Sequence, residues 1–203
     1  MNLVGYIAAA GVVVVAPGAD TLVVVKNALT GGAVRALRSA AGVCSGLAVW
    51  ALLSAVGLAA LLAASTALFT VVKVVGAAYL IFLGVKTILS ARQPTEINDS
   101  KTPNSWRQGM FTNLGNPKVG IFYTSFLPQF ITDTEHAFTV SLLLAAIHIA
   151  LSFVCLLAYA FLVLRLGNIF QRERWRRTLD VVMGGTLCGL GVALVASSAV
   201  GSN

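Results

Sequence analysis

The sequence predicts an all-α integral membrane protein with six transmembrane helices, arranged as two inverted three-helix repeats. Three observations support this fold class. Hydrophobic residues make up 58% of the 203-residue chain and charged residues only 10%, a composition outside that of soluble domains. Six apolar runs each reach about 20 residues, which is enough to cross a bilayer. The first and fourth runs are each broken by a proline, Pro17 and Pro117.

The six runs leave little of the chain for an extramembrane domain. They cover residues 3–28, 40–63, 67–90, 109–131, 138–163 and 179–200. The longest polar connection, 91–107, contains two prolines and is typical of a flexible loop. We therefore predict one transmembrane domain over residues 1–203, with repeat one at 1–90, a cytoplasmic loop at 91–107 and repeat two at 108–203.

Basic residues follow alternate runs. They occur after the first, third and fifth runs and are absent from the connections after the second and fourth. They are Lys26, Arg35, Arg38, Arg92, Lys101, Arg107, Arg165, Arg172, Arg174, Arg176 and Arg177. Because cytoplasmic loops carry such an excess, we predict that both termini lie outside. The net charge of +7 then reflects topology, and nucleic-acid binding is not expected.

The first run is not expected to form one continuous helix. Pro17 removes a backbone donor, and Gly18 loosens the chain beside it. Asp20 at membrane depth is unfavourable unless another group pairs with it. We predict a half-helix from about Asp20 to Leu29 that ends at Gly31-Gly32. With no basic residue before it, the run is expected to be retained rather than cleaved as a signal peptide.

Glycines in the second and sixth runs predict close helix contacts. Gly42 and Gly46 lie on one face of the second run, where tight packing within the chain is favoured over dimerisation. Gly185 and Gly189 repeat this spacing in the sixth run. These faces permit a homodimer in the membrane lipid without requiring one.

The second break lies in the fourth run, at Pro117. Two asparagines and a lysine surround it: Asn113, Asn116 and Lys118. Pro117 lies ten residues after Arg107 and Pro17 nine residues before Lys26, which puts both breaks about 14–15 Å deep. Each half of the chain has three runs, an odd number, so the second half is inverted relative to the first. Inverted repeats of this kind predict a site near the midplane, where the two breaks meet.

A zwitterionic amino acid would suit this predicted site. The half-helix after each proline is expected to present free N–H donors and its positive dipole end, to which a carboxylate binds with help from Lys118 and the amides. Asp20 would face the ammonium group. The candidate substrate-binding residues are Pro17, Gly18, Asp20, Asn113, Asn116, Pro117 and Lys118. Structural alternatives stay open: Asp20 as an N-cap or a partner of Lys118, and the amides as donors to backbone freed by the break.

Four stretches around these residues carry a family resemblance over the whole length of the chain. They are Pro17-Gly18-Ala19-Asp20, residues 27–35, residues 108–118 and Phe126-Leu127-Pro128-Gln129-Phe130. The sequence resembles the LysE/RhtB family of amino-acid exporters, with Ala19 standing where the family usually has a second proline. The resemblance implies secondary active export of amino acids or their derivatives across the bacterial inner membrane, by proton antiport. It does not fix the side-chain class of the substrate.

Two titratable residues are candidates for proton coupling. Asp20 is favoured, because burial disfavours its charge while a substrate ammonium or Lys118 favours it, so that occupancy and protonation are linked. His148 is the second candidate because imidazole titrates near neutral pH. The alternative for His148 is a buried structural histidine.

The main rival function is export of a cation or heavy metal by a member of the same superfamily. No cluster of His or Cys supports it, and Cys44, Cys155 and Cys188 lie in separate apolar runs. We therefore predict no metal site and no cofactor. A membrane enzyme is not expected either, because no Cys-x-x-Cys, His-Glu-x-x-His or serine-elbow pattern occurs.

Overall fold

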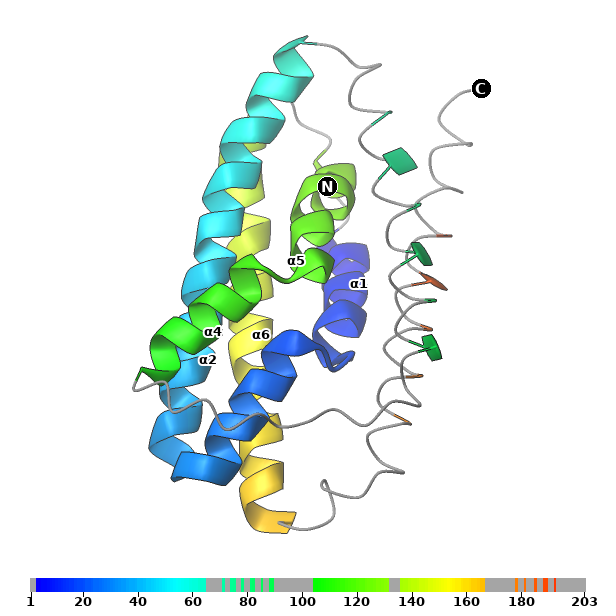
Figure 1. Ribbon diagram of the computed structural model, residues 1–203. Helices are drawn as coiled ribbons and strands as arrows, with labels where there is room; N and C mark the ends of the chain where they lie inside the picture. Colours follow the sequence, from blue (N-terminus) through cyan, green and yellow to red (C-terminus); the bar gives the residue numbers. More distant parts are fainter. Residues whose placement is uncertain are drawn as a thin grey trace.

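The structure is a computed structural model that describes residues 3–64, 104–131 and 136–166, with single positions between 71 and 89 and between 178 and 192. Within these ranges every element is helical (Figure 1). The elements are α1 (Leu3–Val15), α2 (Ala19–Ala64), α4 (Ser105–Leu114), α5 (Pro117–Ile121), the π-helix η1 (Phe122–Phe126), the 3-10 helix η2 (Leu127–Phe130) and α6 (Ala137–Leu166). Most positions of the predicted third and sixth spans, and residues 91–103 of the predicted loop, lie outside the described residues.

Two described stretches are long and apolar enough to cross a membrane, judged by length and composition. They are Ala19–Gly57 and Ala137–Leu166. The helix α1 is more apolar still but has only 13 residues. All-helical structure is therefore confirmed for the described part, while the arrangement as six helices in two inverted repeats stays a prediction.

The first predicted break is confirmed. The last backbone bond of α1 runs from Ala16 N to Val12 O, at 3.1 Å. Pro17 has no N–H with which to continue the helix. The chain restarts as a helix at Ala19, and Leu22 N bonds to Gly18 O at 2.9 Å.

The long helix α2 consists of two helices joined at Gly31-Gly32, where the sequence predicts the half-helix to end. Gly31 has φ −151° and Gly32 has φ 69°, in the left-handed region that favours glycine. The second helix starts directly after the turn, several residues before the predicted residue 40. Arg35, predicted to lie in a loop, therefore belongs to this helix and packs its side chain against Gly31.

The second predicted break is confirmed between α4 and α5. Gly115 ends α4, and Pro117 is the first residue of α5, a position where its missing N–H removes no helical bond. Beyond α5 the chain passes through π and 3-10 geometry up to Phe130. The fourth predicted run, 109–131, thus consists of the end of the 10-residue helix α4, the break at Pro117 and a short helix of mixed geometry.

A close crossing of α2 and α4 brings the two breaks together. A Cβ atom on Gly42 would lie 1.9 Å from Trp106 O, and one on Gly109 would lie 2.0 Å from Ser39 O. Only glycine allows the two backbones to approach so closely. The prediction that Gly42 and its neighbour on the same face serve packing within the chain is confirmed. The helix α6 packs against both α1 and α2 (Figure 1).

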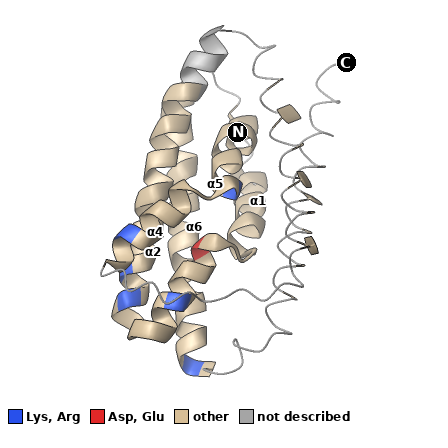
Figure 2. Ribbon diagram, viewed as in Figure 1, with Lys and Arg blue, Asp and Glu red and all other residues tan. Residues whose placement is uncertain are grey.

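Charged positions fall into two groups along the described helices. Figure 2 shows most Lys and Arg residues at one end, near the Gly31-Gly32 turn, and one basic and one acidic position in the middle. The described basic residues are Lys26, Arg35, Arg38, Arg107, Lys118 and Arg165. Asp20 is the acidic residue of the described part. The two charges in the middle mark the candidate site.

Candidate functional site

The two breaks are in direct contact through Asp20 and Asn113. Asp20 lies in the first turn of α2, immediately after the first break, and Asn113 lies near the end of α4, immediately before the second. Asn113 Nδ2 donates a hydrogen bond of 2.9 Å to Asp20 Oδ2. A direct contact between residues 93 apart in sequence places both breaks at one point in the structure.

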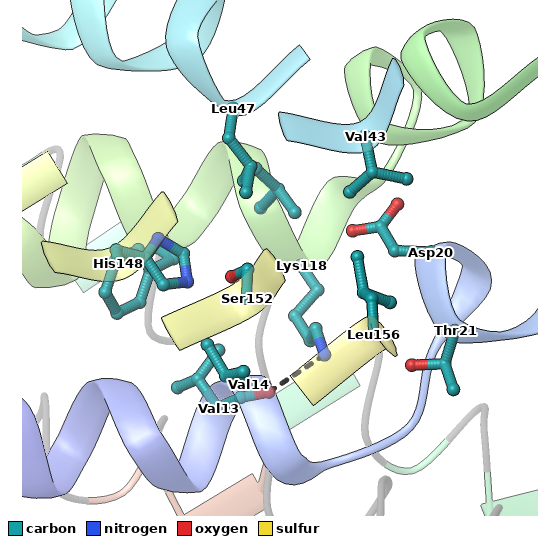
Figure 3. Close-up of a pocket in the computed structure, with 12 residues that line it drawn as sticks. Val13, Val14, Asp20, Thr21, Val43, Leu47, Lys118, His148, Ser152 and Leu156 are labelled. Atoms are coloured by element: carbon teal, nitrogen blue, oxygen red, sulfur yellow. Dashed lines mark hydrogen bonds between the residues drawn. The ribbon is translucent and has the colours of Figure 1, made fainter. Parts of the chain in front are cut away.

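A small cavity of about 30 Å³ lies beside this contact (Figure 3). Its polar lining comes from Asp20, Thr21, Lys118, His148 and Ser152. The apolar lining comes from Val13, Val14, Val43, Leu47, Val119, Phe122 and Leu156. A cavity of this size holds one or two water molecules and is smaller than an amino acid. An amino acid would enter only if the surrounding helices moved apart.

Lys118 points from α5 toward the end of α1 (Figure 3). Its Nζ donates to Val13 O at 3.1 Å and to Ala16 O at 2.9 Å. Within the described part of the chain, no ion pair joins Lys118 to Asp20, although each charge acts on the other through the cavity. An ammonium has three donors, so two are engaged by backbone and one remains.

The broken end of α1 is bonded entirely by side chains of the second half of the chain. A helix leaves its last four carbonyls without helical partners, and here these belong to residues 13–16. Lys118 bonds the first and last of them. Cys155 Sγ lies 3.7 Å from Val14 O, and Tyr159 OH donates to Val15 O at 2.7 Å.

Cys155 and Tyr159 are among the site residues that the sequence analysis missed, together with Thr21 and Ser152 of the cavity lining. Cys155 and Tyr159 come from α6 and lie four residues apart, on the helix face that also carries Ser152. A row of polar side chains at this spacing in an apolar helix is the signal that was available.

The predicted free N–H donors at the start of α5 are not present, which corrects one expectation. Asn116 Oδ1 accepts from Lys118 N at 3.1 Å, and Asn116 O accepts from Val119 N at 3.1 Å and Gly120 N at 3.2 Å. Pro117 has no N–H. Because Asn116 caps the helix fully, α5 offers no backbone donor to a carboxylate.

Three buried polar atoms at the meeting point have no hydrogen-bond partner among the described residues. They are Asp20 Oδ1, Asn113 Oδ1 and Asn116 Nδ2. The opposite atom of each amide has a fixed partner, so these orientations follow from the hydrogen bonds. Asn113 Oδ1 faces Gly46, which has no side chain to fill the space. Of the three residues, Asp20 lines the cavity.

His148 lies at the opposite side of the cavity from the breaks. It is 3% exposed, its Nδ1 lies 3.3 Å from Tyr123 OH, and its ring centroid lies 4.3 Å from that of Phe122. These contacts fix the ring among aromatic side chains while one edge faces the cavity. Both predicted titratable residues, Asp20 and His148, therefore line the same space.

The described residues contain no group of three His, Cys, Asp or Glu side chains that could hold a metal ion. Cys44, Cys155 and Cys188 are free thiols on separate helical segments.

Comparison of the sequence with known proteins identifies the family of this chain. A protein-family model for the LysE type translocator matches residues 12–198. The chain is 30% identical to the uncharacterized membrane protein YrhP of Bacillus subtilis, over 94% of this chain and 97% of that one. It is 32% identical to the uncharacterized membrane protein PA4757 of Pseudomonas aeruginosa, over 95% and 94% of the two chains.

A further relative has a functional name. The leucine efflux protein of Klebsiella pneumoniae is 29% identical, over 94% of this chain and 90% of that protein. No solved structure matches the chain. The family match extends over both breaks and the cavity between them, and the chain therefore belongs to the LysE-type translocator family.

Proposed function

We propose that this protein is a secondary active exporter of amino acids or their derivatives, which works by proton antiport across the bacterial inner membrane. The observation that carries the proposal is the state of Asp20. Its carboxylate lines the cavity, one oxygen accepts a hydrogen bond from Asn113, and the other is buried near the Asn116 amide without a hydrogen bond from any described residue. A buried, unpaired carboxylate oxygen at membrane depth is costly unless a cation or a proton binds it. The ammonium of a substrate supplies such a cation.

The remaining lining supplies the other two parts of an amino-acid site. Lys118 has one donor left for the substrate carboxylate. Valine, leucine and phenylalanine side chains form the rest of the wall and suit an uncharged substrate side chain. The name of the Klebsiella relative agrees with this expectation. Pro17 and Gly18 prevent a continuous helix at the first break. Pro117 and the capping residue Asn116 do the same at the second break.

Proton coupling is assigned to Asp20, with His148 as the second candidate. Once the substrate ammonium leaves, the Asp20 carboxylate loses its cation, and a proton takes its place. Substrate and proton then compete for the same oxygen, which is the requirement for antiport. His148 faces the same cavity and offers a second position for the proton.

The orientation that we propose puts both termini outside. The described basic residues other than Lys118 gather at one end of the helices (Figure 2), as expected for a cytoplasmic face.

The proposal is tested with purified protein in proteoliposomes. We expect counterflow of a neutral amino acid within a panel of neutral, basic and acidic ones, and acceleration by an imposed pH gradient. Asp20→Asn keeps the shape of the side chain and removes the charge, so we expect at least about a hundredfold loss of coupled flux, equivalent to about 2.7 kcal/mol. Asp20→Glu is the matched control, because it retains a carboxylate.

Two results would contradict the proposal. Coupled flux that is unchanged in Asp20→Asn removes this residue from the mechanism. A flux signal for divalent metals alone, with none for any amino acid, would support the rival metal exporter. Unfolding temperature and gel filtration of each variant establish that the protein is folded.

A further inference from the structure

We propose that the Lys118 ammonium is a tethered cation, which occupies a monovalent-cation site at the broken end of α1. Transporters with discontinuous helices commonly bind Na⁺ at the carbonyl end of a half-helix. Here the chain supplies the positive charge itself, from the other broken helix. The consequence for coupling, that transport needs no Na⁺, rests on the proposed transport function, whereas the cation site does not.

The first support is the geometry around Nζ. Its two bonded partners, Val13 O and Ala16 O, belong to the last turn of α1 and lie 3.1 Å and 2.9 Å away. No backbone N–H in the described residues bonds to either carbonyl. The helix dipole adds negative partial charge at the same end. Two carbonyl oxygens at a negative helix end attract any small cation.

The second support is the contrast among the four free carbonyls of α1. The two that do not bond to Lys118, Val14 O and Val15 O, receive neutral donors from Cys155 and Tyr159. Of the two residues whose carbonyls bond the ammonium, Val13 lines the cavity. No described residue of α6 donates to either oxygen of this pair, and the Lys118 ammonium supplies both donors instead.

The third support is the set of groups that surround Lys118. Asp20 from α2 provides a negative charge near the ammonium. Two titratable groups of α6 also interact electrostatically with Lys118: Cys155 and His148. Thr21 and Ser152 add hydroxyl oxygens to the same cavity. Oxygen ligands, carboxylates among them, are the ones that hard cations prefer.

The inference makes Lys118 a link between the two halves of the chain. Its backbone is on α5, and its ammonium is bonded to α1. While it stays in place, the carbonyls of Val13 and Ala16 are not available to a metal ion. Removing the ammonium should open the site to external cations.

The experiment compares cation effects on stability in detergent, without substrate. Full-length wild type and Lys118→Ala are heated in choline chloride, sodium chloride and methylammonium chloride of equal concentration. We expect Lys118→Ala to unfold at a lower temperature in choline and to regain about 3 °C or more in methylammonium or Na⁺, because a cation that binds only the folded state stabilises it. Wild type should show the same unfolding temperature in all three salts.

Tyr159→Phe is the matched control for this experiment. It removes the donor to Val15 O but no charge, so it should lose stability equally in all three salts. Equal behaviour of Lys118→Ala in all three salts would overturn the inference, as would a Na⁺ response of the wild type.

A second measurement uses the wild type alone and needs no folded variant. In proteoliposomes, replacing Na⁺ by choline should change amino-acid flux by less than twofold, and a strict Na⁺ requirement would overturn the inference. If no amino acid is transported at all, the proposed function fails, while the salt dependence of unfolding still decides whether the cation site exists.

Discussion

At the first break, the last carbonyls of α1, which have no partner within the helix, accept hydrogen bonds from side chains in the other half of the chain. At the second break, the free groups are bonded by residues next to them in sequence. Tyr159 and Lys118, more than 100 residues away, bond the end of α1. By contrast, Asn116 caps α5, and Gly115 N bonds to Phe111 O at 3.0 Å.

This difference assigns different roles to two breaks that look alike in sequence. A locally capped break keeps its hydrogen bonds when neighbouring helices move, whereas the end of α1 keeps its bonds only while α5 and α6 stay against it. Relative movement of the two halves must therefore exchange or strain the bonds at the first break. We infer that the first break responds to movement and that the second is a fixed support.

The half-helices beyond the breaks differ as well. The first is regular from Ala19 to the Gly31-Gly32 turn, while the second changes from α to π to 3-10 geometry. Pro128 accounts for this change, since it lacks the N–H that a regular helix needs there. Two side chains also donate to carbonyls four residues earlier in this segment: Thr124 Oγ1 to Gly120 O at 2.9 Å, and Gln129 Nε2 to Ser125 O at 3.0 Å.

The largest effect is expected when the contact between the two breaks is forced apart. Gly109→Ala places a Cβ about 2.0 Å from the backbone oxygen of Ser39, so α4 must shift away from α2. We expect a loss of about 3 kcal/mol, near the upper end of the range for overpacking, because backbone cannot yield as a side chain can. Denaturation in detergent measures this loss. Transport should also fail, since Asn113 would no longer reach Asp20.

Gly57→Ala is the control for this substitution. A Cβ on Gly57 would meet no described atom within 4 Å, so stability and transport should stay at the wild-type level. Equal loss in both variants would show that α2 and α4 do not pack as closely as described.

A smaller effect is expected when the local cap of the second break is removed. Asn116→Ala deletes the oxygen that accepts from Lys118 N, and losing an N-cap costs about 1–1.5 kcal/mol. Asn116→Ser retains a capping oxygen and should recover most of that stability. If the second break is self-contained, the salt response of Lys118→Ala should be the same with or without Asn116→Ala. A changed salt response would mean that the two breaks are structurally coupled and that the second break is not self-contained.

The sequence was sufficient to predict the breaks, because proline and glycine act locally. Pro17, Pro117 and the Gly31-Gly32 turn all lie where their backbone chemistry indicates. The depth estimate for Pro17 and Pro117 also predicted that the two breaks meet, since helical rise converts residue counts to distance.

The partners of individual polar groups could not be predicted in this way. Whether Asn116 uses its oxygen on α5 or on a ligand depends on one side-chain rotation. Whether Lys118 faces a substrate or the end of α1 depends on how α5 packs against α1. Tyr159 gave no signal alone, because its partner is a backbone carbonyl of a distant helix.

The smallest effect on stability is expected from Tyr159→Phe. This variant also tests most specifically whether the first break, unlike the second, responds to movement of the two halves. The change removes one hydrogen bond of 2.7 Å to Val15 O and should cost about 1 kcal/mol of unfolding free energy. Tyr6→Phe is the matched control, since it removes a bond of 2.8 Å to Leu144 O away from either break. Tyr6→Phe should cost at least as much stability, because its bond is fully buried, but only Tyr159→Phe should change the transport rate, by about two- to tenfold, because the end of α1 must exchange its partners when the halves move. Equal transport rates in the two variants would mean that the first break is as fixed as the second.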